Sequence, residues 1–245
     1  MTQSPTKDFV ALPRGAAAER DAALRLAQYL LTCGSMRPSA FTMPVFAAVV
    51  CFVLSEWISP TWLALWWGAV ALFSSGNAAI DHWQTRSSVT TANVDGWIRL
   101  RCIQGFVFNV NWTLPAFMFW SQLDDLGRMF LILIYACSMS GGIALSSACR
   151  PWAISLMPPL VLAIVVPPAF GGTWFYWSIS FLSLGFSSYM GYLAVLFHNA
   201  ARDAIRLQDK NADLVAERVR KNGADTLTSI GAISAKSRVK DQDDA

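Results

Sequence analysis

The chain has 245 residues, of which 54% are hydrophobic and only 14% are charged, and it carries 11 tryptophans and 15 phenylalanines. This composition is too apolar for an ordinary soluble domain of that length and indicates an integral membrane protein. The net charge of +3 calls for no nucleic-acid partner, because the basic residues gather where membrane topology places them.

Residues 1–39 form a predicted cytoplasmic N-terminal arm. Within it, Ala16–Leu31 has an apolar stripe from which Arg20 and Arg25 are excluded. This pattern is typical of an amphipathic helix that lies on the inner leaflet or packs on a neighbouring helix. The arm is basic and has no long apolar core, so we do not expect a cleavable signal peptide.

Residues 40–198 contain the apolar segments. A bilayer core of about 30 Å needs roughly 20 apolar residues per helix. Six nearly uncharged runs satisfy this length: Ala40–Ile58, Thr61–Ile80, Cys102–Ser121, Met129–Ala148, Trp152–Phe170 and Thr173–Phe197. Proline and paired glycines separate several of them, as expected between helices. The sequence therefore predicts an all-α polytopic fold, a six-helix transmembrane bundle with a cytoplasmic exit helix.

Lysine and arginine accumulate in cytoplasmic loops, so their distribution predicts the orientation of the bundle. With the N-terminus inside, every one of the 19 basic residues except Arg128 falls on the cytoplasmic side. An even number of spans agrees with this. We expect both termini to be cytoplasmic.

Few polar residues interrupt the spans. Asn77 lies late in the second, and Asn109 and Asn111 lie in the third beside Trp112. Buried amides in lipid commonly form hydrogen bonds between helices, which is one interpretation of these residues. The other is that Asn77, Asn109, Asn111 and Trp112 line a pocket for a small ligand.

The residues around the cytoplasmic loop between the second and third spans are expected to meet water. A short helix, "VDGWIRLRC", precedes the third span and places Trp97, Arg99 and Arg101 at the headgroup boundary, while Asp81 and His82 end the second span within reach of water. The chain has no phosphate-binding glycine loop, metal-ligand motif or nucleophile elbow. We therefore expect no catalytic residue, metal or cofactor.

Residues 199–222 continue the last span as a predicted signalling helix. One face of this helix forms a seam. Ala200, Leu207 and Leu214 recur in it every seven residues, and Ala204, Asn211 and Arg218 alternate with them. Such a seam favours a short two-stranded coiled coil and hence a homodimer, although a single solvated helix also fits. Gly223 is expected to break the helix, and residues 223–245 are predicted to be a disordered tail.

Four segments carry a resemblance to a known family: "WIRLRC" (Trp97–Cys102), "GGIALSSA" (Gly141–Ala148), "MPPLVLAIVVP" (Met157–Pro167) and "AIRLQDKNADLVAE" (Ala204–Glu217). Together they resemble the membrane-spanning input region of bacterial sensor histidine kinases, often hybrid kinases, and of some diguanylate cyclases. The resemblance implies a sensor module in a bacterial inner membrane that relays a membrane or small-ligand signal in a two-component system.

The same resemblance extends into the tail. "AISAKSR" (Ala232–Arg238) is similar to the segment that leads into the phosphoacceptor helix of such kinases, but the sequence then departs from that pattern and has no histidine after His198. Autophosphorylation of the family's kind is therefore not expected on this chain, and the output is expected from a kinase core outside it or from a separate cytoplasmic protein.

Other functions stay open at this point. The chain is also compatible with the input module of a diguanylate cyclase, or with an accessory or assembly subunit that binds a larger membrane complex through its tryptophan-rich faces. An electron carrier that ligates haem through His82 and His198, both at cytoplasmic ends of spans, is a further alternative.

Overall fold

The computed structural model describes residues 14–243, so the first 13 residues of the predicted arm and the last two of the predicted tail lie outside it. In this part of the chain the regular structure is entirely helical, which confirms the predicted all-α class. The helices are α1 (Arg14–Met36), α2 (Ser39–Leu54), α3 (Pro60–Arg86), α4 (Val94–Met118), α5 (Asp125–Ser146), α6 (Arg150–Ala169) and α7 (Trp174–Asp243). The chain divides after Arg202 into two compact units.

Four helices are long and apolar enough to cross a membrane: α3, α5, α6 and the Trp174–Ala212 part of α7. The pair formed by Asp21–Met36 of α1 and Ser39–Leu54 of α2, bent by 40°, meets the same criterion together and would be a fifth span. Length and composition thus support four or five spans rather than the predicted six. Of the six predicted spans, α2 meets the criterion only together with α1, and α4 does not meet it. The apolar part of α4 is interrupted by Arg101, Gln104, Asn109 and Asn111.

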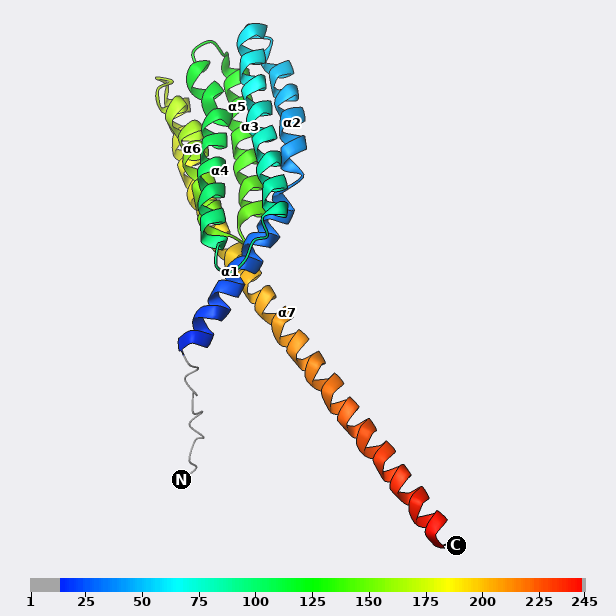
Figure 1. The fold of residues 1–245 in the computed structure, drawn as a ribbon. Coiled ribbons are helices and arrows are strands. Elements are labelled where there is room, and N and C mark those ends of the chain that lie inside the picture. Colours follow the sequence, from blue (N-terminus) through cyan, green and yellow to red (C-terminus); the bar gives the residue numbers. More distant parts are fainter. Residues whose placement is uncertain (1–13, 244–245) are drawn as a thin grey trace, which may run out of the picture. The chain divides into compact units, whose positions relative to one another are not determined.

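Within the first unit, α2 to α6 lie side by side as a bundle (Figure 1). α4 packs on α6, α3 and α1, while α2 packs on α3 and α5 packs on α6. α4 therefore has neighbours on several sides, and buried residues run along most of its length. Asn109 and Asn111 of α4 are buried, whereas Ile103, Phe106 and Phe117 of the same helix are exposed. α4 therefore keeps its amides inside the bundle and presents apolar side chains outward.

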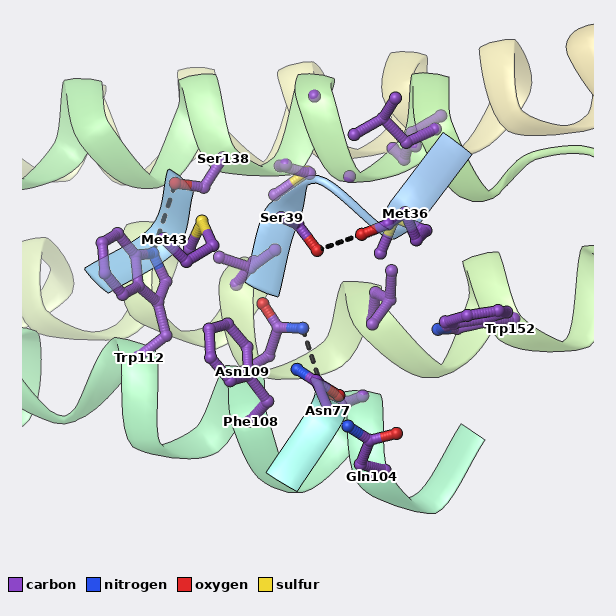
Figure 2. A pocket seen from close by; sticks show the side chains of 18 of the residues that line it. Met36, Ser39, Met43, Asn77, Gln104, Phe108, Asn109, Trp112, Ser138 and Trp152 are labelled. Atoms are coloured by element: carbon purple, nitrogen blue, oxygen red, sulfur yellow. Dashed lines mark hydrogen bonds between the residues drawn. The ribbon is translucent and has the colours of Figure 1, made fainter. Parts of the chain in front are cut away.

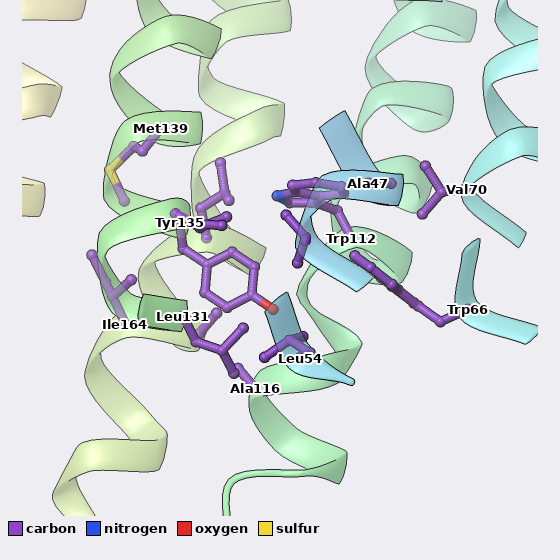
Figure 3. Close-up of a cluster of buried hydrophobic side chains, with 14 of the residues drawn as sticks. Ala47, Leu54, Trp66, Val70, Trp112, Ala116, Leu131, Tyr135, Met139 and Ile164 are labelled. Carbon is purple, nitrogen blue, oxygen red and sulfur yellow. The ribbon is translucent and has the colours of Figure 1, made fainter. Parts of the chain in front are cut away.

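The main core of the bundle is aromatic and aliphatic (Figure 3). Trp112 of α4 is fully buried, and its ring lies 5.8 Å from that of Phe46 and 5.4 Å from that of Trp66, measured between centroids. Tyr135 and Leu131 of α5 pack into the same cluster. The outward faces are apolar as well, with Phe52 and Phe181 each 80% exposed. Such faces suit contact with lipid chains.

α1 is longer than the predicted Ala16–Leu31 helix, and its second half is part of the bundle. Tyr29 is fully buried, and its hydroxyl donates a hydrogen bond of 2.9 Å to Oε1 of Gln84 in α3. The ring of Tyr29 also lies 6.5 Å from that of Trp152 in α6. This part of the arm packs on neighbouring helices, the second of the two interpretations given above.

The short helix predicted before the third span is not separate from it. α4 runs without interruption from Val94, and its first turns bury Trp97 and Arg101, which are 9% and 3% exposed. Inside the bundle, Arg101 meets the carboxylate of Asp81, which compensates its charge. The position of both residues at the headgroup boundary stays a prediction, because burial against other helices does not fix their depth in a membrane.

α7 begins in the bundle, where the Ser180 hydroxyl donates to the Val165 carbonyl of α6 at 2.8 Å. It then continues through Gly223 to Asp243, where the sequence predicted a break and a disordered tail. A single helical glycine costs only about 1 kcal/mol relative to alanine, and no proline follows to end the helix.

Candidate ligand-binding cavity

The first unit contains a cavity of about 300 Å³ at the end of the bundle where α1 meets α2. This volume lies at the lower end of the range for small-molecule pockets, about 300–1,000 Å³. Its walls come from the last residue of α1 and from α2, α3, α4, α5 and α6 (Figure 2). A large share of the wall is apolar, formed by Met36, Met43, Phe46, Phe108, Met139, Leu145, Leu156, Met157 and Leu160.

Three of the four residues predicted to bind a ligand lie on this wall: Asn77, Asn109 and Trp112. The fourth, Asn111, does not line the cavity. Its backbone carbonyl accepts a 2.9 Å hydrogen bond from Nε1 of Trp66, so it belongs to the α3–α4 contact. The structure thus brings three of these residues to one cavity, and ligand binding by them stays a prediction.

One end of the cavity holds an ion pair. Arg101 of α4 donates through Nη2 to Oδ1 of Asp81 in α3, and through the same nitrogen to Oε1 of Gln84 at 3.2 Å. Its Nη1 donates to Oε1 of Gln104 at 3.1 Å. A buried guanidinium needs both an opposite charge and additional acceptors, and these three side chains supply them.

The guanidinium of Arg101 also lies against Trp152 of α6, at 5.7 Å from the centroid of its ring. Three side-chain donors at this end have no acceptor within the described residues: Nε of Arg101, Nε2 of Gln104 and Nε1 of Trp152. Buried donors without partners are costly, so this layer of the bundle is not fully satisfied by the protein alone.

Neutral polar groups occupy the part of the wall between the ion pair and the aromatic core. In the view of Figure 2, Asn77 of α3 lies between Asn109 and Gln104 of α4. Nδ2 of Asn109 donates to the carbonyl of Gly105 at 2.9 Å, and the Oδ1 atom of Asn109 is left to accept from another donor. Ser138 of α5 accepts a 3.2 Å hydrogen bond from Nε1 of Trp112. The wall therefore offers amide and hydroxyl groups beside a compensated charge pair.

Several residues of the wall are also exposed, and they mark the mouth of the cavity. Cys137, Gly141 and Leu145 are exposed at intervals of four along α5, and Thr42 of α2 is exposed as well. Residues four apart share one face of a helix. The mouth therefore lies between this face of α5 and the first turns of α2.

The predicted seam of the signalling helix is exposed at all six positions, Ala200, Ala204, Leu207, Asn211, Leu214 and Arg218. Leu207 and Leu214 are 60% and 58% exposed. Two exposed leucines seven residues apart on this part of α7 are available to a partner helix. Dimerisation through the seam stays a prediction.

Sequence analysis missed the Arg101–Asp81 pair and the role of Gln84. The signal that points to it is the presence of opposite charges on the two helices that flank a short loop, residues 87–93, since such helices meet at this end. The two histidines differ in setting: His82 is exposed, whereas Nδ1 of His198 lies 3.3 and 3.1 Å from the carbonyl oxygens of Ser147 and Ala148.

Within the described range, no three His, Cys, Asp or Glu residues are grouped closely enough to hold a metal ion. Comparisons with protein-family models, with curated proteins and with solved structures find no match to the chain.

Proposed function

We propose that the chain is the membrane input module of a bacterial signalling kinase, which relays a membrane or small-ligand signal through α7. The observation that supports this most directly is the continuity of α7, which starts among the apolar helices of the bundle and runs on as a polar helix to Asp243. A continuous helix transmits rotation or axial shift, because its hydrogen-bonded ladder resists local deformation.

The bundle holds the first part of α7 at both ends. Near its start, the Tyr176 hydroxyl donates to Oδ1 of Asp125, and Arg128 lies 5.4 Å from the Tyr176 ring. Further along, His198 meets the last carbonyls before α6. A rearrangement of α5 or α6 would therefore be passed to α7, which is the population shift that a relay requires.

The proposal includes six membrane crossings with both termini in the cytoplasm of a bacterial cell. α4 would be the crossing that apolar composition alone does not identify, because it carries the buried polar residues Arg101, Asn109 and Asn111. In this arrangement the signalling helices of two copies pair along the seam at Leu207 and Leu214.

The relay is tested by joining residues 1–222 to the dimerisation and ATP-binding core of a histidine kinase and measuring autophosphorylation in membranes. Insertion of two alanines after Gln208 turns the following helix by about 200°, whereas insertion of seven keeps the heptad phase. We expect the two-residue insertion to change the autophosphorylation rate strongly and the seven-residue insertion to restore the parent rate. A rate that ignores insertion length, or that changes steadily with it, contradicts the relay.

A further inference from the structure

We propose that the cavity binds a neutral, single-chain amphiphile, whose uncharged hydroxyl or amide head meets Asn77 and Asn109 and whose tail lies against the methionine and aromatic wall. The inference concerns occupancy of the cavity and does not depend on signalling through α7.

The asparagines supply the head-group partners. Within residues 14–243 the Asn77 side chain makes no hydrogen bond, although it is partly buried on the cavity wall. Nδ2 of Asn109 donates to the carbonyl of Gly105, and its Oδ1 is the atom left as an acceptor. Together they offer a donor and two acceptors, which a hydroxyl or amide matches.

The charges on the wall argue for a neutral head. The charged side chains that line the cavity are Asp81 and Arg101, and these compensate each other. A carboxylate or ammonium ligand would be buried beside a pair that is already neutral, and it would find no unpaired counter-charge there. Burying such a charge is unfavourable, whereas a neutral head loses only ordinary hydrogen bonds to water.

The rest of the wall suits a flexible apolar chain. Four methionines, Met36, Met43, Met139 and Met157, line it together with Phe46 and Phe108. Methionine side chains are unbranched and polarisable, so they adapt to chains of different shape. The volume of about 300 Å³ accommodates one chain rather than the two of a diacyl lipid.

The mouth gives this ligand a route from the bilayer. It lies beside Gly141, where a Cβ would meet no atom within 4 Å. Gly68 on α3 has equally open space but does not line the cavity. Leucine at position 141 would therefore project into the mouth, while leucine at position 68 provides a matched change from glycine in a helix.

The test uses the full chain in detergent micelles and a decan-1-ol that carries a photoreactive diazirine on its chain. After irradiation, the labelled peptides are mapped, and decan-1-ol, decane and decanoate are compared as competitors at neutral pH. We expect the probe to label Met43–Phe46 or Met139–Leu145. Decan-1-ol should displace this probe about tenfold more effectively than decane or decanoate, because decane and decanoate lose one or two hydrogen bonds to the asparagines.

The variants decide where the probe binds. Gly141→Leu and Asn77→Leu should each lower cavity labelling severalfold, whereas Gly68→Leu should leave it unchanged. Asn77→Leu removes no hydrogen bond of the described structure. If the Asn77→Leu protein nevertheless loses helical content, Gly141→Leu alone provides the test. Equal competition by decane, stronger competition by decanoate, or wild-type labelling in Gly141→Leu would each overturn the proposal.

Discussion

Arg101 carries a charge at a position where only 3% of the residue is exposed. Its partner Asp81 is 18% exposed at the side chain, so the pair lies largely out of water. Substitution Arg101→Met leaves the Asp81 carboxylate without its counter-charge and should lower the free energy of unfolding by about 3–5 kcal/mol. Unfolding in mixed micelles, followed by far-ultraviolet circular dichroism, measures this loss.

A second ion pair in the first unit is the control for that prediction. Arg25 lies 3.5 Å from Asp95, but the two side chains are 52% and 67% exposed. Solvent screens such pairs, so Arg25→Met should cost no more than about 1 kcal/mol. In addition, Asp81→Asn combined with Arg101→Met should cost less than the two single losses added together. Equal losses for Arg25→Met and Arg101→Met would show that the buried pair is not coupled.

Gly105 allows α4 and α6 to approach closely. A Cβ at this position would lie 2.7 Å from Cδ2 of Leu156 and 3.1 Å from Nε1 of Trp152. Gly105→Ala should therefore destabilise the bundle by about 1–3 kcal/mol through overpacking. Gly68→Ala, where the space is open, should be neutral or stabilising by up to about 1 kcal/mol because alanine favours the helix. Opposite signs in the same unfolding assay are expected, and a shared sign would contradict this packing.

At the scale of the helices, hydropathy predicted most elements well, because one physical constraint produces both the apolar runs and the helices. A stretch that must satisfy its own backbone in lipid is both apolar and helical, and proline or paired glycine ends it. α3, α5 and α6 therefore lie close to the predicted segments. The burial of Arg101 in the first turns of α4 was not predicted, because a charge that is neutralised by another helix is indistinguishable, in one sequence, from a charge in water.

The cavity was predictable only in part, for the same reason. Asn77, Asn109 and Trp112 stand out as polar or large residues in apolar runs, so sequence analysis selected them. Asn111 stands out equally and yet does not line the cavity, because the phase of a helix is not fixed until its neighbouring helices are known. The methionine wall and the mouth at Gly141 arise from four different helices and have no local signal.

The seam of α7 makes a prediction at the scale of this helix. In a background without native cysteines, Leu207→Cys and Leu214→Cys should form disulfide-linked dimers under mild oxidation, because the same position of two parallel helices meets across a coiled coil. Arg206→Cys and Lys210→Cys, which are exposed but lie off the seam, should cross-link far less. Non-reducing gel electrophoresis of membranes measures the difference, and uniform cross-linking at all four positions would argue against the seam.

At the scale of the whole molecule, the open question is whether α4 crosses the membrane. The length and composition of α4 do not identify it as a span, whereas its packing on α3 and α6 suits a crossing. The loops at its two ends differ accordingly: if α4 crosses, residues 87–93 and residues 119–124 lie on opposite sides of the membrane, and if it does not, they lie on the same side.

Single cysteines at exposed positions of these loops decide between the two topologies. In a cysteine-free chain expressed in bacterial cells, Gln122→Cys should react with a membrane-impermeant maleimide added outside, and Ala92→Cys should react only after the cells are broken. The expected asymmetry follows from the basic residues, since Arg86 and Arg99 flank the first loop and Arg128 alone adjoins the second. Equal reactivity of both cysteines in intact cells would remove α4 from the set of spans, and with it the even number of crossings that places both ends of the chain in the cytoplasm.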